Sequence, residues 1–249
     1  YYSVLAGNVK KAFNKKFYNP ETRSYGDFGS NIFALVLGVP DDRYDDVVAT
    51  LKHEISVKYD NHLNTGIFGT QFFFETLALN GLNDIAYNAM NQEDFPSFGN
   101  WIKQGATVTW EKWNGADSRN HPMFGGGLTW FYRILAGVNV DAERPAYEHI
   151  IIKPILDKRL PEVYYSHMTP YGEVVSEIRQ TGRNLEMNVT VPVGSTATIY
   201  IPVGGNTSEV TESGISVRDS KDVRFERIQD GNCIVRVPQG KYKFKVDNQ

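Results

Sequence analysis

The stretch that decides the fold is IFGTQFFFETLALNG, residues 67–81. A helix built from it carries apolar side chains around most of its circumference, and Gly81 stands where a C-terminal cap is expected. A helix that is apolar on all sides has to be enclosed by protein. IFALVLG (32–38) and MFGGGLTWFYRILAG (123–137) have the same character and also end in glycine. We therefore predict three buried helices in the first half of the chain.

An amphipathic segment precedes each buried one. These segments are residues 3–18, 41–57 and 83–92, and each has one apolar stripe at helical spacing. In the first of them the stripe consists of Val4, Leu5, Val9, Ala12 and Phe13. Alternating outer and inner helices are typical of an α/α barrel, in which helical hairpins form two concentric rings.

The hydrophobic period changes near residue 139 from that of a helix to that of a strand. LEMNVTVPV (185–193) alternates, so that one face receives Leu185, Met187, Val189, Val191 and Val193. TATIYIPV (196–203) and KYKFKV (241–246) alternate in the same way. Turn motifs recur about every ten residues, as expected for an antiparallel β-sandwich, at 181–183, 203–206, 230–232 and 238–240.

The predicted fold class is therefore α followed by β in two domains. Residues 1–138 are predicted to form an α/α barrel or part of one. Residues 139–249 are predicted to form an antiparallel β-sandwich.

Composition limits the classes of function. The 249 residues are 41% hydrophobic and 22% charged, which favours a folded protein over a disordered one. The net charge of −3, without a Lys/Arg run, argues against a nucleic-acid partner. No apolar run approaches the roughly 18 residues of a membrane span, and residue 1 opens into helix-like sequence without a signal-peptide pattern. The compartment stays open between periplasmic, extracellular and cytoplasmic.

The single cysteine, Cys233, excludes an intrachain disulfide and a cysteine-based zinc site. It stands in a strand-like apolar run, which predicts a buried thiol. The acids and histidines show no metal-ligand spacing. The sequence therefore indicates no metal site and no other cofactor, and a calcium requirement stays open.

A polar motif precedes each predicted buried helix. The motifs are YGDFGSN (25–31), HLNTG (62–66) and WEKWNGADSRNH (110–121). Parallel inner helices would bring all three to one end of the barrel, and convergent polar groups in a pocket indicate a binding site. Indole rings bind the C–H faces of a pyranose, while carboxylate, imidazole and amide groups bind its hydroxyls. The third motif holds Trp110, Glu111, Trp113, Asn120 and His121, so we predict a carbohydrate site with Glu111 as one of the paired carboxyl groups of glycoside hydrolysis.

Each candidate also has a plainer interpretation. Glu111 can be an exposed loop acid, and the tryptophans can be core residues. A histidine here can simply fix its loop, and acids or hydroxyls can cap the following helix. These alternatives apply to Glu111, Trp110, Trp113, His121, His62, Asp27 and Thr65.

Five motifs, taken together and in this order, resemble the α-L-rhamnosidases of glycoside hydrolase family 78. They extend over most of the chain: HLNTGIFGT (62–70), GATVTWEKW (105–113), SRNHPMFGG (118–126), AYEHIIIKP (146–154) and TPYGEVVSEIR (169–179). The resemblance implies an (α/α)6 catalytic barrel followed by a β-sandwich. The six predicted helices of residues 1–138 would be about half of the helices of that barrel. It also implies release of terminal α-L-rhamnose from glycans or glycosides with inversion, so that a rhamnose-containing carbohydrate is the expected partner.

The resemblance further implies roles for individual residues. Glu111 corresponds to the general base, His121 to a residue that binds rhamnose hydroxyls, and Trp110 and Trp113 to an aromatic wall. An aromatic of the family is replaced by Phe98, and we expect Trp101 to stack in its place. Two residues of the same motifs, His62 and Asn120, complete the predicted substrate-binding set.

The acidic motif that carries the family's general acid has no counterpart here. We therefore predict that the chain is the C-terminal portion of a longer enzyme and that the isolated chain is inactive. Its further partner would be the missing N-terminal part, and exposed flanks of the half barrel would promote oligomerisation. One alternative is a non-catalytic carbohydrate-binding protein with the same fold, and another is a different α/α-barrel glycosidase or lyase.

Overall fold

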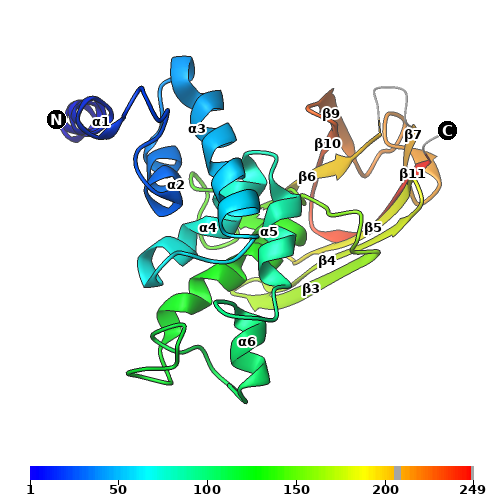
Figure 1. Cartoon of the computed structure of the whole chain (residues 1–249). Coiled ribbons are helices and arrows are strands. Elements are labelled where there is room, and N and C mark those ends of the chain that lie inside the picture. The colour runs from blue at the N-terminus through cyan, green and yellow to red at the C-terminus, as the bar shows by residue number, and fades with distance from the viewer. Residues whose placement is uncertain (205–208, 248–249) are drawn as a thin grey trace. The chain divides into compact units, whose positions relative to one another are not determined.

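The computed structural model describes residues 1–204 and 209–247. The chain forms two compact units, Tyr1–Thr129 and Trp130–Gln249. The first is built from helices and the second mainly from strands (Figure 1). The predicted fold class is thereby confirmed, whereas the domain limits of 1–138 and 139–249 stay a prediction. The predicted turn at 203–206 lies partly outside the described residues.

The helical unit contains six α-helices together with short π- and 3-10 helices among its described residues. In chain order they are α1 (Tyr2–Phe17), α2 (Phe28–Leu37), α3 (Asp41–His53), the π-helix η1 (Glu54–Lys58), α4 (Ile67–Leu79), α5 (Asn83–Met90), α6 (Phe98–Lys103) and the 3-10 helix η2 (Pro122–Leu128). A further π-helix, η3 (Trp130–Leu135), opens the second unit. Among the described helices, none is both long and apolar enough to span a bilayer.

Helix α4 forms the centre of the helical unit. Phe73 and Phe74 are buried in it, and it packs against α2, α5 and η2. The core helix predicted at 67–81 is thus confirmed. Its enclosure is incomplete, because Phe68 and Leu79 near its two ends are each 67% exposed.

The prediction of a single buried helix at 123–137 is wrong, because the segment forms the 3-10 helix η2 and the π-helix η3. Three consecutive glycines from residue 125 disfavour an α-helix. Two of them also permit close packing on α4. A Cβ atom on Gly126 would lie 3.0 Å from the Cα of Gln71, and one on Gly127 would lie 2.9 Å from the ring of Phe74.

Two other helix predictions differ from the structure. Residues 41–57 are α-helical only to His53 and continue as the π-helix η1. Helix α6 was not predicted, because six residues are too few for a clear hydrophobic period. Its start is set locally, since the Ser97 hydroxyl accepts the N–H of Asn100 at 2.9 Å.

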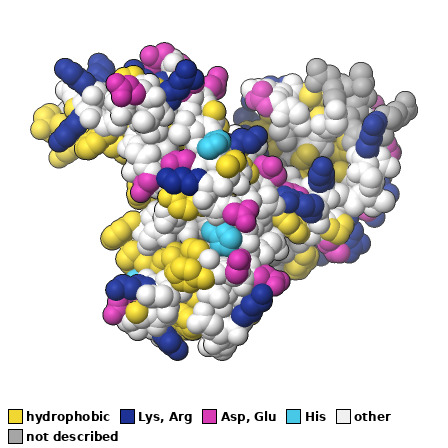
Figure 2. Space-filling model, viewed as in Figure 1, with side chains coloured by type: hydrophobic (Ala, Val, Ile, Leu, Met, Phe, Trp, Pro, Cys, Tyr) yellow, Lys and Arg dark blue, Asp and Glu magenta, His cyan; other side chains and the backbone are white. Residues whose placement is uncertain are grey.

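Helix α1 forms where predicted, but its apolar stripe is not buried. Val4, Leu5 and Val9 are exposed, Val9 to 59%. Hydrophobic and Lys/Arg side chains accordingly lie together on the surface of α1 (Figure 2). Val36 and Leu37 at the end of α2 are exposed as well. The enclosure predicted for the helix at 32–38 is therefore incomplete at its C-terminal end, and oligomerisation through exposed flanks stays a prediction.

The second unit consists of two β-sheets. One has the strand order β1 (Val138–Val140), β2 (His149–Ile152), β6 (Thr196–Pro202), β10 (Asn232–Val237) and β9 (Arg224–Gln229). The other has the order β3 (Glu162–Thr169), β4 (Gly172–Thr181), β5 (Asn184–Val191), β11 (Gly240–Asp247), β7 (Glu209–Glu212) and β8 (Ile215–Ser216). Among the described strands, β2 and β6 pair in parallel and the other pairs are antiparallel.

The core of the β-unit lies between these sheets. Ile199 of the first sheet and Met187 and Phe244 of the second belong to one buried cluster, so the sheets pack face to face. The alternation predicted for β5 is confirmed up to Val191. Val193 is 74% exposed, which corrects the prediction, because β5 ends before Pro192 and Val193 lies beyond it.

Cys233 is buried in the same core, as predicted. Burial raises the pKa of its thiol to about 11. The thiol therefore remains neutral and serves as a small core residue.

The packing of η2 on α4 can be tested with two alanine variants. Gly127→Ala should destabilise the chain by about 1–3 kcal/mol, because the added methyl would overlap the buried ring of Phe74. Gly125→Ala is the matched control, since its Cβ would meet nothing within 4 Å. Urea unfolding followed by tryptophan fluorescence measures both. Equal losses in the two variants would contradict the packing argument.

Candidate functional site

The loop that carries Glu111 and His121 closes on itself through its main chain. The N–H of Glu111 donates to the carbonyl of Ser118 at 2.8 Å, and the N–H of His121 donates to the carbonyl of Thr109 at 2.8 Å. The Thr109 hydroxyl also donates to the His121 carbonyl at 2.6 Å. This pairing holds Glu111 and His121 in one compact loop. The Ser118 N–H in turn donates to Glu111 Oε2 at 3.1 Å, which orients the half-buried carboxylate.

An aromatic cluster supports this loop. Trp101, Trp110 and Phe124 are its buried members, and Trp113 is half-buried against them. The ring centroid of Trp113 lies 4.5 Å from that of Trp101 and 4.4 Å from that of Phe124. Trp101 donates its indole N–H to the carbonyl of Trp113 at 2.9 Å. Packing thus holds the indole of Trp113, and the hydrogen bond holds its main chain.

Two of the predicted sugar-binding tryptophans occupy core positions. Trp101 is 2% exposed and Trp110 is 4% exposed. The guanidinium of Arg119 lies 4.7 Å from the ring centre of Trp110, and Gly115 also packs against that ring. Direct stacking of these two rings on a sugar stays a prediction. Among the predicted tryptophans, Trp113 has the more accessible ring.

The structure joins the second and third polar motifs. The indole N–H of Trp113 donates to the carbonyl of Thr65 at 3.0 Å. The Thr65 hydroxyl is 2.7 Å from the hydroxyl of Thr70, which lies in the first turn of α4. The N-cap residue of α4 is Gly66, so the interpretation of Thr65 as the helix cap is wrong. The loop of Glu111 is thereby attached to the N-terminal end of the central helix.

His121 and Asn120 lie side by side in this loop. Among the described residues, the buried Nδ1 atom of His121 has no hydrogen-bond partner. A buried polar atom without a partner is costly, and a ligand hydroxyl would remove that cost. Asn120 is exposed, and its N–H donates to the Ser118 hydroxyl at 3.2 Å.

His62 makes contacts that fix its own loop. Its Nε2 lies 2.8 Å from Asp94 Oδ1, and its Nδ1 lies 3.0 Å from the carbonyl of Tyr59. Burial acts to lower the pKa of His62, but the Asp94 carboxylate and the Tyr59 carbonyl outweigh it and hold the pKa above its usual value. The same bond lowers the pKa of Asp94. Substrate binding by His62 stays a prediction.

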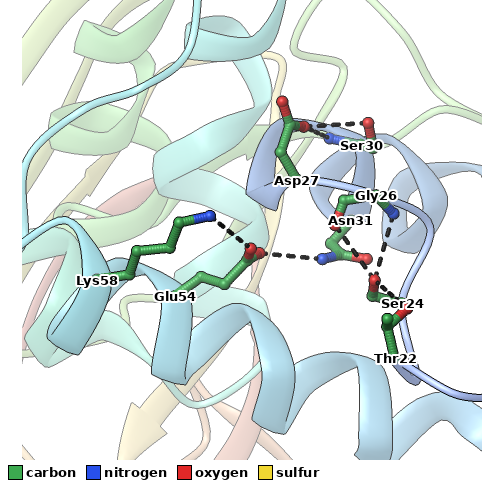
Figure 3. Close-up of polar contacts among 8 residues, drawn as sticks. All are labelled: Thr22, Ser24, Gly26, Asp27, Ser30, Asn31, Glu54 and Lys58. Atoms are coloured by element: carbon green, nitrogen blue, oxygen red, sulfur yellow. Dashed lines mark hydrogen bonds and ion pairs between the residues drawn. The ribbon is translucent and has the colours of Figure 1, made fainter.

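The first polar motif makes its contacts with another part of the helical unit (Figure 3). Asp27 accepts the N–H and the hydroxyl of Ser30, each at 3.1 Å, which confirms its interpretation as a helix cap. The fully buried Asn31 donates to Glu54 Oε2 at 3.3 Å, and Lys58 lies 3.7 Å from Glu54 Oε1.

Sequence reasoning missed Glu54 and Asp94. Burial raises the pKa of Glu54, against the opposing effects of Lys58 and Asn31. Glu54 lies three residues after the buried Leu51, on the apolar side of its helix. A carboxyl group on an apolar stripe was therefore the signal that could have found it. Among the described residues, no group of three or more His, Cys, Asp or Glu side chains could hold a metal ion.

Comparison with known proteins identifies two matching families. The bacterial α-L-rhamnosidase 6 hairpin glycosidase domain matches residues 1–135, and the bacterial α-L-rhamnosidase C-terminal domain matches residues 137–216. An α-L-rhamnosidase of Formosa agariphila is 27% identical over 248 residues, which cover 95% of this chain and 26% of that protein. The chain thus spans about a quarter of the length of the curated relatives it matches.

Solved structures of α-L-rhamnosidases are also similar to this chain. The α-L-rhamnosidase of Dictyoglumus thermophilum is 34% identical with a TM-score of 0.88, over 100% of this chain and 28% of that one. The α-L-rhamnosidase of Streptomyces avermitilis, complexed with L-rhamnose, is 25% identical with a TM-score of 0.83, over 99% of this chain and 24% of that one.

The His62–Asp94 pair predicts a pH effect on stability. The pKa of His62 is raised on folding, so the pair stabilises the fold fully below the unfolded pKa of about 6.5 and loses this effect as pH rises through the folded value. The stability difference between wild type and Asp94→Asn should therefore shrink above about pH 6.5. Urea unfolding at a series of pH values measures it.

The matched control is His53→Gln, which removes an exposed histidine of α3. In this background, Asp94→Asn should have the same effect as in the wild type. A constant difference between wild type and Asp94→Asn across this pH range would contradict the assignment.

Proposed function

The chain belongs to the bacterial α-L-rhamnosidase family, and from this premise we propose that it supplies the base-carrying part of an inverting α-L-rhamnosidase. Its substrates would be glycans or glycosides that end in α-L-rhamnose. The observation that carries the proposal is the loop around Glu111, where a half-buried carboxylate, the half-buried Trp113 and the unpartnered Nδ1 of His121 occur together.

In this proposal Glu111 removes a proton from the attacking water. Its Oε2 is occupied by the N–H of Ser118, so we assign Oε1 to the water. The water would attack the anomeric carbon on the face opposite the leaving oxygen, while a second carboxyl group protonates that oxygen. In inverting enzymes the two carboxyl groups are about 6.5–9.5 Å apart, which leaves room for the water.

The neighbouring side chains would bind the sugar. We assign a rhamnose hydroxyl to Nδ1 of His121, and stacking on the sugar ring to the accessible part of Trp113. Asn120, exposed beside His121, would reach a further hydroxyl. Trp101 and Trp110 would act mainly by holding Trp113 and the loop in place, because both are buried in the aromatic cluster against which Trp113 packs.

We place the general acid outside this chain, since no residue here matches the acidic motif of the family. One carboxyl group cannot both activate water and protonate the leaving oxygen in a single inverting step. The isolated 249-residue chain should therefore not hydrolyse an aryl α-L-rhamnoside. The rival function is sugar binding without catalysis, which the His121 and Trp113 arrangement would also support.

The role of Glu111 is tested in the full-length enzyme. Glu111→Gln should lower kcat for an aryl α-L-rhamnoside by about 10²–10⁴-fold, the usual contribution of a general base. Binding of rhamnose should persist, because the hydroxyl-binding groups remain. Glu173→Gln, which changes an exposed carboxylate of β4, is the control and should retain full activity. Near-normal turnover by Glu111→Gln would refute the base assignment, and rhamnose binding without any wild-type turnover would favour the rival function.

We further propose that the exposed apolar surface of α1 packs on another part of the barrel in the complete enzyme. In the isolated chain, the same surface should cause self-association. Val4, Leu5 and Val9 provide this surface on α1.

Val9→Glu tests the role of α1 in self-association. A charge at this exposed site should shift the isolated chain toward monomer in sedimentation velocity experiments at several concentrations. Val57→Glu is the control, because Val57 is 65% exposed but belongs to η1 instead of α1. If the wild type is already monomeric, or if both variants behave alike, α1 is not the associating surface.

A further inference from the structure

A groove of about 510 Å³ crosses one end of the β-unit. Its walls come from both sheets, because the turn between β4 and β5 lines one side and the end of β6 with the turn between β9 and β10 lines another. Residues 153–156, which follow β2, complete it. Its volume lies in the range of small-molecule sites and suits a ligand of one or two sugar rings. The groove belongs to the β-unit, whereas the loop of Glu111 belongs to the helical unit.

Side-chain to backbone hydrogen bonds hold the walls of this groove. The Asn232 amide donates to the carbonyl of Asp230 at 2.9 Å, which fixes the turn between β9 and β10. The Gln180 amide donates to the carbonyl of Leu160 at 2.9 Å, which fixes the segment beside β4. A groove with fixed walls requires little ordering when a ligand binds, and this favours affinity.

The lining combines cations, amides and apolar surface. Lys153 and Arg183 supply two positive charges, and Asp230 supplies one negative charge. The Nζ of Lys153 lies 5.1 Å from the ring centre of Tyr200, a cation–π contact that positions it. Leu185 contributes apolar surface. The groove lining thus contains more cationic than anionic side chains, whereas the chain as a whole carries −3.

We propose that this groove is a second carbohydrate site, and that it binds an oligosaccharide bearing a carboxylate, such as a uronic acid. Arg183 and Lys153 would bind the carboxylate, since a guanidinium or ammonium forms strong hydrogen bonds with it. The amide of Asn184 would bind ring hydroxyls, and Leu185 would contact the C–H face of the ring. The site would hold a charged glycan on the β-unit independently of the chemistry at Glu111.

Calorimetric titration of the full chain with digalacturonate tests the proposal, with its neutral dimethyl ester as the matched ligand. The acid should bind and the ester should bind at least about tenfold more weakly, because it lacks the carboxylates. Arg183→Gln and Lys153→Gln should each weaken binding of the acid by a similar factor. Lys243→Gln, an exposed cation of β11 outside the groove, should bind as the wild type does.

Raising the salt concentration on the wild type should also weaken binding, which tests the charge contact without any substitution. Glu111→Gln should leave the affinity unchanged, so that this proposal and the proposed function fail independently. Equal affinity for the acid and the ester, unchanged affinity in both cation variants, or no binding of the acid would each overturn the proposal.

Discussion

The need to enclose α4 is the constraint on which the rest of the helical unit depends. Its phenylalanines are covered on one side by η2, and this contact requires glycine at positions 126 and 127. Any side chain there would push η2 away from Gln71 and Phe74. Because the loop of Glu111 runs directly into η2, the close contact also determines where that loop lies.

The same constraint explains the structural role of the tryptophans. Once η2 is packed on α4, Phe124 is carried into the core and Trp101 and Trp113 close around it. The bond from Trp113 to the carbonyl of Thr65 then attaches the loop to the first turn of α4. The buried helix α4 thus determines where the polar loop lies, because the indole N–H of Trp113 connects the two. Packing in the core therefore holds the loop in place.

The sequence predicted those features that depend on a repeating pattern. The apolar circumference of α4 and the alternation of β5 are local properties, and both elements formed where the pattern placed them. The prediction failed where packing overrode the local pattern, as in η2 and η3, or where one residue broke it, as Pro192 does before Val193. The exposed stripe of α1 is a different case, since the helix is correct and its stripe simply has no covering segment among the described residues.

The candidate site was predictable only in part, for a related reason. Glu111 and His121 lie ten residues apart in one loop, so a local motif could place them together. His62 and Asp94 are separated by 32 positions and Asn31 and Glu54 by 23, and no period in the sequence specifies such pairs. Burial identifies Asn31 and Glu54, because a buried polar group needs a partner from elsewhere in the fold. Asp94 is exposed, so only the folded structure shows its contact with His62.

The proposed inverting reaction makes a division of the site between segments physically reasonable. Its two carboxyl groups do not touch, since a water molecule and the sugar lie between them. Each can therefore be oriented by its own surroundings. Here Glu111 is oriented by its own loop: the Ser118 N–H holds one oxygen, and the main-chain pairing of the loop holds the backbone. Under the proposed mechanism, a base held in this manner would need only the substrate, and not the acid, to set the position of its water.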